Sequence, residues 1–139
     1  CLAMTKLTHT SAALVAALLS GLAGTTLAAA EDLGIRAPEG FEVSLFADDG
    51  LATNICALTV DSLGRVVVAG PGFVRILLDE DGDGKSEKAK EFSDAPKTGA
   101  QGLYFDGRDL ICTGDAGLLL LRDSDADNRA DGPPSVPGP

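Results

Sequence analysis

The feature that most constrains the fold is an internal repeat. Segment 57–87, ALTVDSLGRVVVAGPGFVRILLDEDGDGKSE, aligns with segment 102–131, GLYFDGRDLICTGDAGLLLLRDSDADNRAD. The offset is 45 residues at the start and 44 at the end, because the second copy has one residue fewer in a turn. The aligned pairs include Leu58 with Leu103, Asp61 with Asp106, Gly70 with Gly114 and Asp79 with Asp123. A period in the forties built from short strands is typical of β-propeller blades.

Short apolar runs separated by turn residues predict the strands of these blades. The runs are FEVSLFA, NICALTV, RVVVAG, FVRILL and KAKEF in the first half, and Tyr104 with Phe105 falls in a strand that we expect to face the core. Sustained helical periodicity is absent after residue 30. We therefore predict an all-β partial β-propeller, with the first strands and blade 1 in residues 31–94, most of blade 2 in 95–132, and a Pro/Gly-rich tail at 133–139.

The small number of blades bears on the organisation of the protein. A propeller closes its ring with roughly four to eight blades, and an open piece exposes unpaired strand edges. We therefore expect these residues to be the front end of a longer protein, with a small free-standing β-domain as the alternative.

Residues 1–30 have the pattern of a secretory signal peptide. Met4 is the natural start, which leaves the three residues before it upstream, and Lys6 precedes the apolar run SAALVAALLSGLAG. Ala28 and Ala30 provide the small-x-small cleavage pattern. A membrane helix is the alternative, but the run is shorter than the roughly 20 strongly apolar residues that a span needs. We expect a secreted, periplasmic or cell-surface protein without a membrane span in its mature chain.

The net charge of the chain favours binding to cations over binding to polyanions. The chain has 21 acids against 11 Lys and Arg, a formal net charge of −10, so it lacks the basic surface that nucleic acid or an anionic membrane requires. Nine of the 21 acids lie within segments 79–87 and 123–131. Acids concentrated in this way favour cation sites.

The first acidic segment, DEDGDGKSE, has the ligand spacing of a calcium loop. Calcium binds about six to eight oxygens, and a tight loop supplies them from alternate residues. Gly84, at the sixth position, permits the positive φ of a sharp turn. The predicted ligands are the carboxylates of Asp79, Asp81, Asp83 and Glu87 and the backbone carbonyl of Lys85.

The second segment, DSDADNRAD, repeats this arrangement. Its predicted ligands are the carboxylates of Asp123, Asp125, Asp127 and Asp131 and the backbone carbonyl of Arg129. Asn128 stands at the sixth position, where Asn is the residue best suited after Gly. Because all these ligands come from the loop itself, we expect a closed calcium site that stabilises a hairpin. An Asp/Gly-rich turn that needs no metal is the alternative.

An EF-hand is excluded, because Lys90 stands at the twelfth position of the first loop and the flanks are strand-like. The form D-x-D-x-D-G-x-x-D/E between two strands resembles the calcium loops of integrin α-chain propellers.

Catalytic candidates are scarce. The one histidine, His9, lies in the predicted signal peptide, and no serine has a partner base that the sequence identifies. Asp115 in TGDAG reads as a turn residue rather than an acid or ligand. Cys56 and Cys112 lie in apolar runs, and the sequence is compatible with a disulfide between them or with two buried free thiols.

Several of these segments together resemble the opening of a bacterial family. The segments are APEGFEVSLFADD, ALTVDSLGRVVVAG, VRILLDEDGDGKSEKAKEFSD and LLLLRDSDADNRADG, and the resemblance covers residues 37–132. The family comprises secreted propeller proteins of planctomycetes and their relatives that are labelled membrane-bound dehydrogenases. Other calcium-loop propellers share the acidic hairpin, so this motif is only moderately specific.

The resemblance implies a propeller similar to that of glucose/sorbosone dehydrogenases, often followed by a c-type cytochrome domain with a C-x-x-C-H motif. It implies an oxidoreductase that passes electrons from a sugar to haem c, with a quinone cofactor as an option. This chain departs from that pattern, because it lacks the haem motif and the catalytic histidine. Only the acidic loop positions carry over.

Three hypotheses follow for the function. The first is the N-terminal propeller part of a secreted dehydrogenase-like protein, linked to a downstream cytochrome c domain. The second is a non-enzymatic, calcium-stabilised propeller that binds glycans or proteins at the cell surface. The third is a truncated product without activity of its own.

Overall fold

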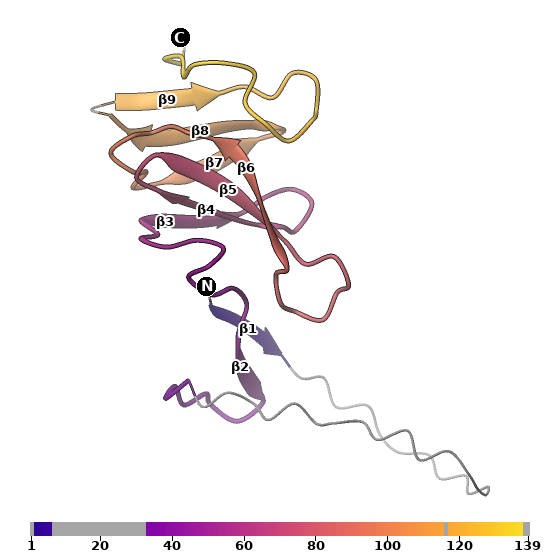
Figure 1. The fold of residues 1–139 in the computed structure, drawn as a ribbon. Helices are drawn as coiled ribbons and strands as arrows, with labels where there is room; N and C mark the ends of the chain where they lie inside the picture. The colour runs from indigo at the N-terminus through magenta and orange to yellow at the C-terminus, as the bar shows by residue number, and fades with distance from the viewer. Residues whose placement is uncertain (1, 7–32, 116, 138–139) are drawn as a thin grey trace, which may run out of the picture. The chain divides into compact units, whose positions relative to one another are not determined.

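The computed structural model describes residues 2–6, 33–115 and 117–137, and these residues form strands, turns and loops without a helix (Figure 1). The chain divides into two compact units, residues 1–45 and 46–139. In the first unit, β1 (Leu2–Lys6) pairs antiparallel with β2 (Phe41–Leu45). The sequence predicted β2 but not β1, which falls within the predicted signal peptide. Residues 7–30 of that predicted peptide lie outside the described residues.

Blade 1 of the second unit is a four-stranded antiparallel meander in the order β3-β4-β5-β6. Its strands are β3 (Ala57–Val60), β4 (Val66–Gly70), β5 (Phe73–Leu78) and β6 (Lys88–Ser93). The predicted strands match these closely, except that the strand expected from residue 54 begins at residue 57. The cause is local: Asn54 has a left-handed φ of 54°, which is incompatible with a regular strand.

Blade 2 has three antiparallel strands in the order β7-β8-β9. They are β7 (Leu103–Asp106), β8 (Asp109–Gly114) and β9 (Gly117–Leu121). Ser135 adds an isolated antiparallel bridge to Leu120, with N–H···O distances of 2.7 and 3.0 Å between the two backbones. Part of the predicted tail thus lies along β9, as β6 lies along β5 in blade 1. The prediction of an all-β partial propeller with one blade and most of a second is confirmed.

The hydrophobic core lies between the two blades. Blade 1 contributes the fully buried Val67, Val74, Ile76 and Phe92, and blade 2 contributes Leu110, Cys112 and Leu121. The rings of Phe92 and Phe105 meet edge to face, with centroids 5.8 Å apart. Such a contact adds to the stabilisation from burial alone.

The expectation that both aromatic residues of β7 face the core is correct for one and wrong for the other. Phe105 packs against the buried cluster, whereas Tyr104 is 65% exposed. Successive side chains of a strand point to opposite faces of the sheet, so neighbouring residues cannot share a core. Tyr104 therefore lies on the face of blade 2 that points away from blade 1.

Gly70 and Gly114, which the repeat aligns, end the second strand of each blade where another segment approaches closely. A Cβ on Gly70 would lie 2.5 Å from the Phe73 ring, and a Cβ on Gly114 would lie 2.5 Å from the Pro96 ring. Both distances are too short for a real contact. The two glycines therefore leave the space that these rings occupy.

Candidate metal centres

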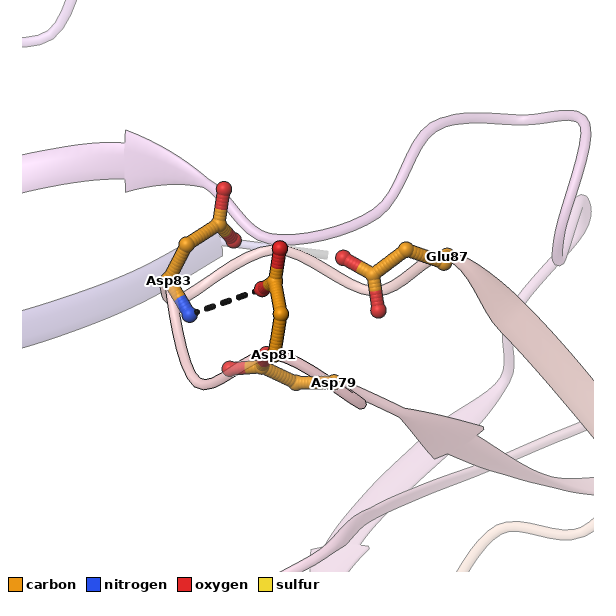
Figure 2. Close-up of side chains that lie close together, drawn as sticks. All are labelled: Asp79, Asp81, Asp83 and Glu87. Carbon is orange, nitrogen blue, oxygen red and sulfur yellow. Dashed lines mark hydrogen bonds between the residues drawn. The ribbon is translucent and has the colours of Figure 1, made fainter.

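The first acidic loop connects β5 to β6 and brings its acids together. Figure 2 shows the carboxylates of Asp79, Asp81, Asp83 and Glu87 around the interior of the loop. Each of the four offers a carboxylate oxygen, and these oxygens all lie within 4.8 Å of one another. The side chains point inward because the loop backbone winds around them. Four of the five predicted ligands of this loop therefore converge.

Backbone amides of the loop hold these carboxylates in place. Asp79 accepts hydrogen bonds from the amides of Gly82 (2.7 Å) and Gly84 (3.0 Å), one on each oxygen. Asp81 accepts the amide of Asp83 at 3.1 Å (Figure 2). Glu87 reaches back across the loop and accepts the amide of Glu80 at 2.8 Å. The loop is thus ordered around its acids by hydrogen bonds from its own backbone.

The ends of the loop are joined to the strands and to an earlier segment. The Glu87 amide donates to the Leu78 carbonyl at 3.1 Å, which closes the loop where β5 ends. The Ser86 amide donates to the Phe46 carbonyl at 2.7 Å, and the Ser86 hydroxyl contacts the carbonyl of Leu78 at 3.0 Å. These bonds set the position of the loop relative to the body of blade 1.

The turn geometry explains the two glycines. Gly82 and Gly84 have φ values of 76° and 87°, the left-handed region that a side chain disfavours. The sequence predicted this role for Gly84 at position six. It missed Gly82 at position four, which needs the same freedom.

The second acidic loop follows β9 and has a similar hydrogen-bond pattern, although one of the two amides that donate to its first Asp belongs to the fifth loop residue rather than the fourth. Asp123 accepts the amides of Asp127 and Asn128 at 3.1 Å each, one on each oxygen. The Ser124 amide donates to the Asp131 carboxylate at 2.7 Å, as the Glu80 amide does to Glu87. The Asp131 amide closes the loop on the Arg122 carbonyl at 2.8 Å. The internal repeat therefore extends to the loop conformation.

The second loop gathers fewer of its acids. Carboxylate oxygens of Asp123, Asp125 and Asp131 lie within 4.8 Å of one another, and Asp127 is not in that group. The Asp127 carbonyl instead accepts a hydrogen bond from the ammonium of Lys90 in β6. Three of the four predicted carboxylates of this loop therefore converge, and the role of Asp127 as a ligand stays a prediction.

Lys85 and Arg129, predicted to contribute backbone carbonyls, occupy equivalent exposed positions in the two loops. The Lys85 amide donates to the Asp83 carboxylate at 2.8 Å. Lys97 lowers the pKa of the Asp94 carboxyl, and the Arg129 charge adds a smaller effect in the same direction. The role of their carbonyls as ligands stays a prediction.

Contacts with residues outside the loop support the second loop, and no sequence pattern indicated them. The Ala130 amide donates to the Phe92 carbonyl at 2.8 Å, and the Asp123 amide donates to the Asp109 carboxylate at 3.1 Å. Together with Lys90, these contacts join the second loop to both blades. Asp123 also lines a cavity of about 290 Å³ between the blades, beside Phe92 and Phe105.

Asp131 titrates below the ordinary range of an aspartate. Hydrogen bonds from Ser124, through its side chain first and its backbone second, lower the pKa of the Asp131 carboxyl. The Asp131 carboxylate therefore stays charged further into the acid range. Hydrogen bonding to the charged form is the physical cause.

Asp115 is a turn residue, as predicted, and it connects the two blades. Its φ is 47°, and its carboxylate accepts the backbone amides of Lys97 (2.9 Å) and Thr98 (2.8 Å) in the segment that joins the blades. The same hydrogen bonds lower the pKa of the Asp115 carboxyl. Its oxygens are therefore occupied by the chain itself.

The two cysteines of the second unit are free thiols. Cys56 is exposed and Cys112 is buried in the core between the blades. Burial raises the pKa of the Cys112 thiol, and the nearby Asp115 charge adds to that effect. Of the two open alternatives, free thiols describe this structure, although only Cys112 is buried.

The donor set fits a hard cation. Every side-chain ligand in the two converging groups is a carboxylate oxygen, and oxygen is the ligand type that calcium and magnesium prefer. Two oxygens on opposite sides of a calcium ion lie about 4.6–5.2 Å apart, given bonds of about 2.3–2.6 Å. Carboxylates within 4.8 Å of one another are therefore close enough to share one ion, and both groups can hold a metal.

The fold and the loops together define a partial β-propeller with two acidic hairpin loops in matching positions. Residues 29–135 match a domain of unknown function, DUF7133, and the chain belongs to that family. Neither the curated proteins nor the solved structures gave a match to the chain. Within the described part of the chain, no helix has the length and apolar character that crossing a membrane takes.

Proposed function

We propose that the two acidic loops are calcium sites that stabilise the blades of the propeller. The observation that carries this proposal is the repeated loop, in which carboxylates converge within 4.8 Å in two segments 44 residues apart. Similar backbone bonds hold both loops, so the arrangement recurs where the sequence of the non-acidic positions differs. In a turn that binds no metal, bringing like charges together would only add repulsion, and here it occurs in two loops.

Electrostatics gives the physical reason for a cation. Like charges held a few ångströms apart repel, and the loop amides offset only part of that repulsion. A divalent ion at the centre converts the repulsion into attraction toward a common point. The bound ion then stabilises the loop conformation that brought the acids together, because it binds the folded form only.

Each site stabilises a different part of the second unit. The first loop joins β5 to β6 and is hydrogen-bonded to Phe46, so its ion stabilises blade 1 and the segment that leads into it. The second loop contacts Phe92 and Lys90 of blade 1, so its ion stabilises the contact between the blades. Exposed extracellular loops of this kind bind calcium with dissociation constants of about 10⁻⁴–10⁻³ M.

The resemblance to dehydrogenase-type propellers extends this proposal to the protein as a whole. In that case these residues form the N-terminal blades of a secreted or periplasmic oxidoreductase linked to cytochrome c, with haem c or a quinone bound elsewhere. The alternative is a cell-surface propeller that binds glycans or proteins. Under both hypotheses, the residues described above contribute structure and calcium binding.

Thermal unfolding with and without calcium tests the proposed calcium sites. The key variant combines Asp81→Asn with Asp125→Asn, the third position of each loop, because Asn keeps a side-chain oxygen to accept the loop amide. Calcium at about 100 times the dissociation constant is expected to stabilise the wild-type chain by about 2.7 kcal/mol per site. The variant is expected to gain much less.

The same variant has a second expected behaviour that separates calcium binding from simple loss of structure. In a chelator, it should melt at the same temperature as the wild type or higher, because a repulsive charge is removed from each loop. Asp49→Asn, which removes an exposed charge outside both loops, is the matched control and should respond to calcium like the wild type. An equal calcium response of all three chains would contradict the proposal.

A further inference from the structure

The cavity of about 290 Å³ between the two blades has the features of a binding site for a small molecule. Its rim is formed by the β3–β4 turn (residues 61–65), the β7–β8 turn (residues 107–108) and the second acidic loop. We call this space the interblade cavity. Its volume is near the lower end of the range in which proteins bind small organic molecules, and the groups on its wall decide which molecules fit.

Both acids on this wall are occupied by donors of the chain itself. Asp61 is buried, and its carboxylate accepts the amides of Leu63 and Arg65 at 2.9 Å each and the Arg65 guanidinium at 2.7 Å. Asp123 is also buried, and its carboxylate accepts two amides of its own loop, one on each oxygen. The negative charges of the wall are therefore compensated or directed into the second acidic loop.

The side chains left free on the wall are mainly hydrogen-bond donors. Among the described residues, the Arg108 guanidinium, the Asn128 side-chain amide and the Ser62 hydroxyl have no hydrogen-bond or ion-pair partner. A guanidinium carries five N–H donors and no acceptor. Arg65 adds a second guanidinium, which its contacts with Asp61 hold at the rim. A ligand that pairs with this wall therefore supplies acceptors, and a negative charge on it matches the unpaired Arg108.

The remaining side chains of the wall are apolar. Leu63, in the β3–β4 turn, is 72% exposed, and Phe105 of β7 is half-buried. Ile76 and Phe92 form the inner wall, since each is only 1% exposed. Removing apolar surface such as that of Leu63 from water is favourable, so a ligand with an apolar body gains by covering it.

We infer that the interblade cavity binds a small organic anion, a carboxylate on a compact apolar body. Arg108 presents its N–H groups in a planar fork that matches the two oxygens of a carboxylate, and Asn128 and Ser62 supply further donors. The apolar body lies against Leu63 and Phe105. This inference does not rest on calcium binding.

The test is an NMR titration of the isotope-labelled full chain with phenylacetate, which has both a carboxylate and an apolar ring. The expected dissociation constant is on the order of 1 mM, as for other ligands of this size. The shifted amide signals should include residues 61–65, 107–108 and 128. Because Asn128 also belongs to the second acidic loop, the titration is run in calcium and in a chelator, and binding is expected in both.

Two matched probes separate the two parts of the ligand. Phenylacetamide keeps the ring and lacks the charge, whereas acetate keeps the charge and lacks the ring. Each should bind at least about fivefold more weakly than phenylacetate, because one loses the charge-assisted hydrogen bonds and the other loses the apolar contact.

Two variants remove one part of the wall each. Arg108→Gln should weaken phenylacetate binding by about fivefold and leave phenylacetamide binding unchanged. Leu63→Ala should weaken the binding of both ring-bearing probes by about threefold. Both residues are exposed, so these changes are compatible with folding. Arg36→Gln and Leu58→Ala, at exposed residues outside the cavity, are the controls and should bind like the wild type.

Three results would overturn the inference. The first is an absence of shifts around the interblade cavity at several times the expected dissociation constant. The second is phenylacetamide binding as tight as that of phenylacetate, which would rule out recognition of the charge. The third is an equal loss in Arg36→Gln and Arg108→Gln, which would attribute the effect to net charge instead of a site.

Discussion

Asp79 and Asp123 hold the same position in two consecutive loops, and each carboxylate accepts two backbone amides of its own loop, one on each oxygen. The distances are 2.7 and 3.0 Å at Asp79 and 3.1 Å for both bonds at Asp123. This first acid therefore shapes its loop whether or not a metal is bound. Replacing it would disturb the loop itself, which is why the acid at the third position of each loop is the better probe of metal binding.

The two loops carry different residues in the same left-handed conformation at their fourth position, and we expect this difference to affect stability. Gly82 in the first loop and Ala126 in the second both have positive φ, at 76° and 63°. A left-handed conformation costs an alanine about 1–2 kcal/mol. Ala126→Gly should therefore stabilise the chain by about 1 kcal/mol in chemical denaturation, after allowance for the greater freedom of glycine when unfolded.

The same substitution should tighten calcium binding at the second loop, because less strain opposes the bound conformation. Ala130→Gly, at a loop position without positive φ, is the matched control and should not stabilise. If Ala126→Gly were as destabilising as the control, the left-handed conformation of this residue would be contradicted.

Phe92 is expected to be the most sensitive position of the core. It is 1% exposed, contacts Phe105 edge to face and carries the carbonyl that receives the Ala130 amide. Phe92→Ala should lower the free energy of unfolding by about 3–5 kcal/mol, because it leaves a cavity between the blades. Phe41→Ala, at a residue that is 42% exposed, should cost far less. Similar losses for both variants in chemical denaturation would argue against a core between the blades.

The aligned glycines at the ends of β4 and β8 should not tolerate a methyl group. Gly70→Ala and Gly114→Ala each place a Cβ 2.5 Å from a ring, so each should destabilise by about 1–3 kcal/mol through overpacking. Gly117→Ala is the control, since a Cβ there meets nothing within 4 Å. Thermal unfolding of the three variants gives the comparison, and a Gly114→Ala melt equal to that of Gly117→Ala would contradict the close approach of Pro96.

Acid should destabilise the second unit through Asp115 and Asp131. Backbone amides at Asp115, and the hydroxyl and amide of Ser124 at Asp131, lower the pKa of both carboxyls. A carboxyl whose pKa is lower in the folded state stabilises that state above its unfolded pKa, roughly 4, and this contribution is lost as pH falls through the folded pKa.

Asp115→Asn removes one of these titrations while keeping a side-chain acceptor. The variant should be less stable than the wild type at neutral pH, and the difference should shrink as pH falls below about 4. Unfolding by denaturant at several pH values measures the difference. A gap between the two chains that stays constant down to the lowest pH would show that the Asp115 charge has no part in the stability.

The repeat was enough to predict the blades, because each aligned strand meets the same partner strands. The acidic loops were predictable for a related reason, because acids at every second position can face a common centre only where the chain turns tightly. The sequence failed where the outcome depends on a distant residue. Lys90 donates a hydrogen bond to the Asp127 carbonyl, 37 residues further along the chain. The Asp115 carboxylate accepts the amide of Thr98, and Ser135 forms a β-bridge with Leu120. Local spacing carries no information about such contacts.

Tyr104 shows a second limit of local patterns. An aromatic residue in a strand indicates that the strand is partly buried, but it does not say which face of the sheet is covered. The alternation along β7 places Phe105 in the core and Tyr104 outside it. Only the arrangement of the two blades decides between these neighbours.

Calorimetric titration of the full chain with calcium measures binding at the two proposed sites. We predict two sites with dissociation constants near 10⁻⁴–10⁻³ M, the first loop binding more tightly because four of its carboxylates converge against three in the second. Asp81→Asn should remove the tighter site and Asp125→Asn the weaker one, while Asp49→Asn should keep both. Absence of calcium binding at millimolar concentrations, or binding that survives both loop substitutions together, would show that the acidic loops are not calcium sites.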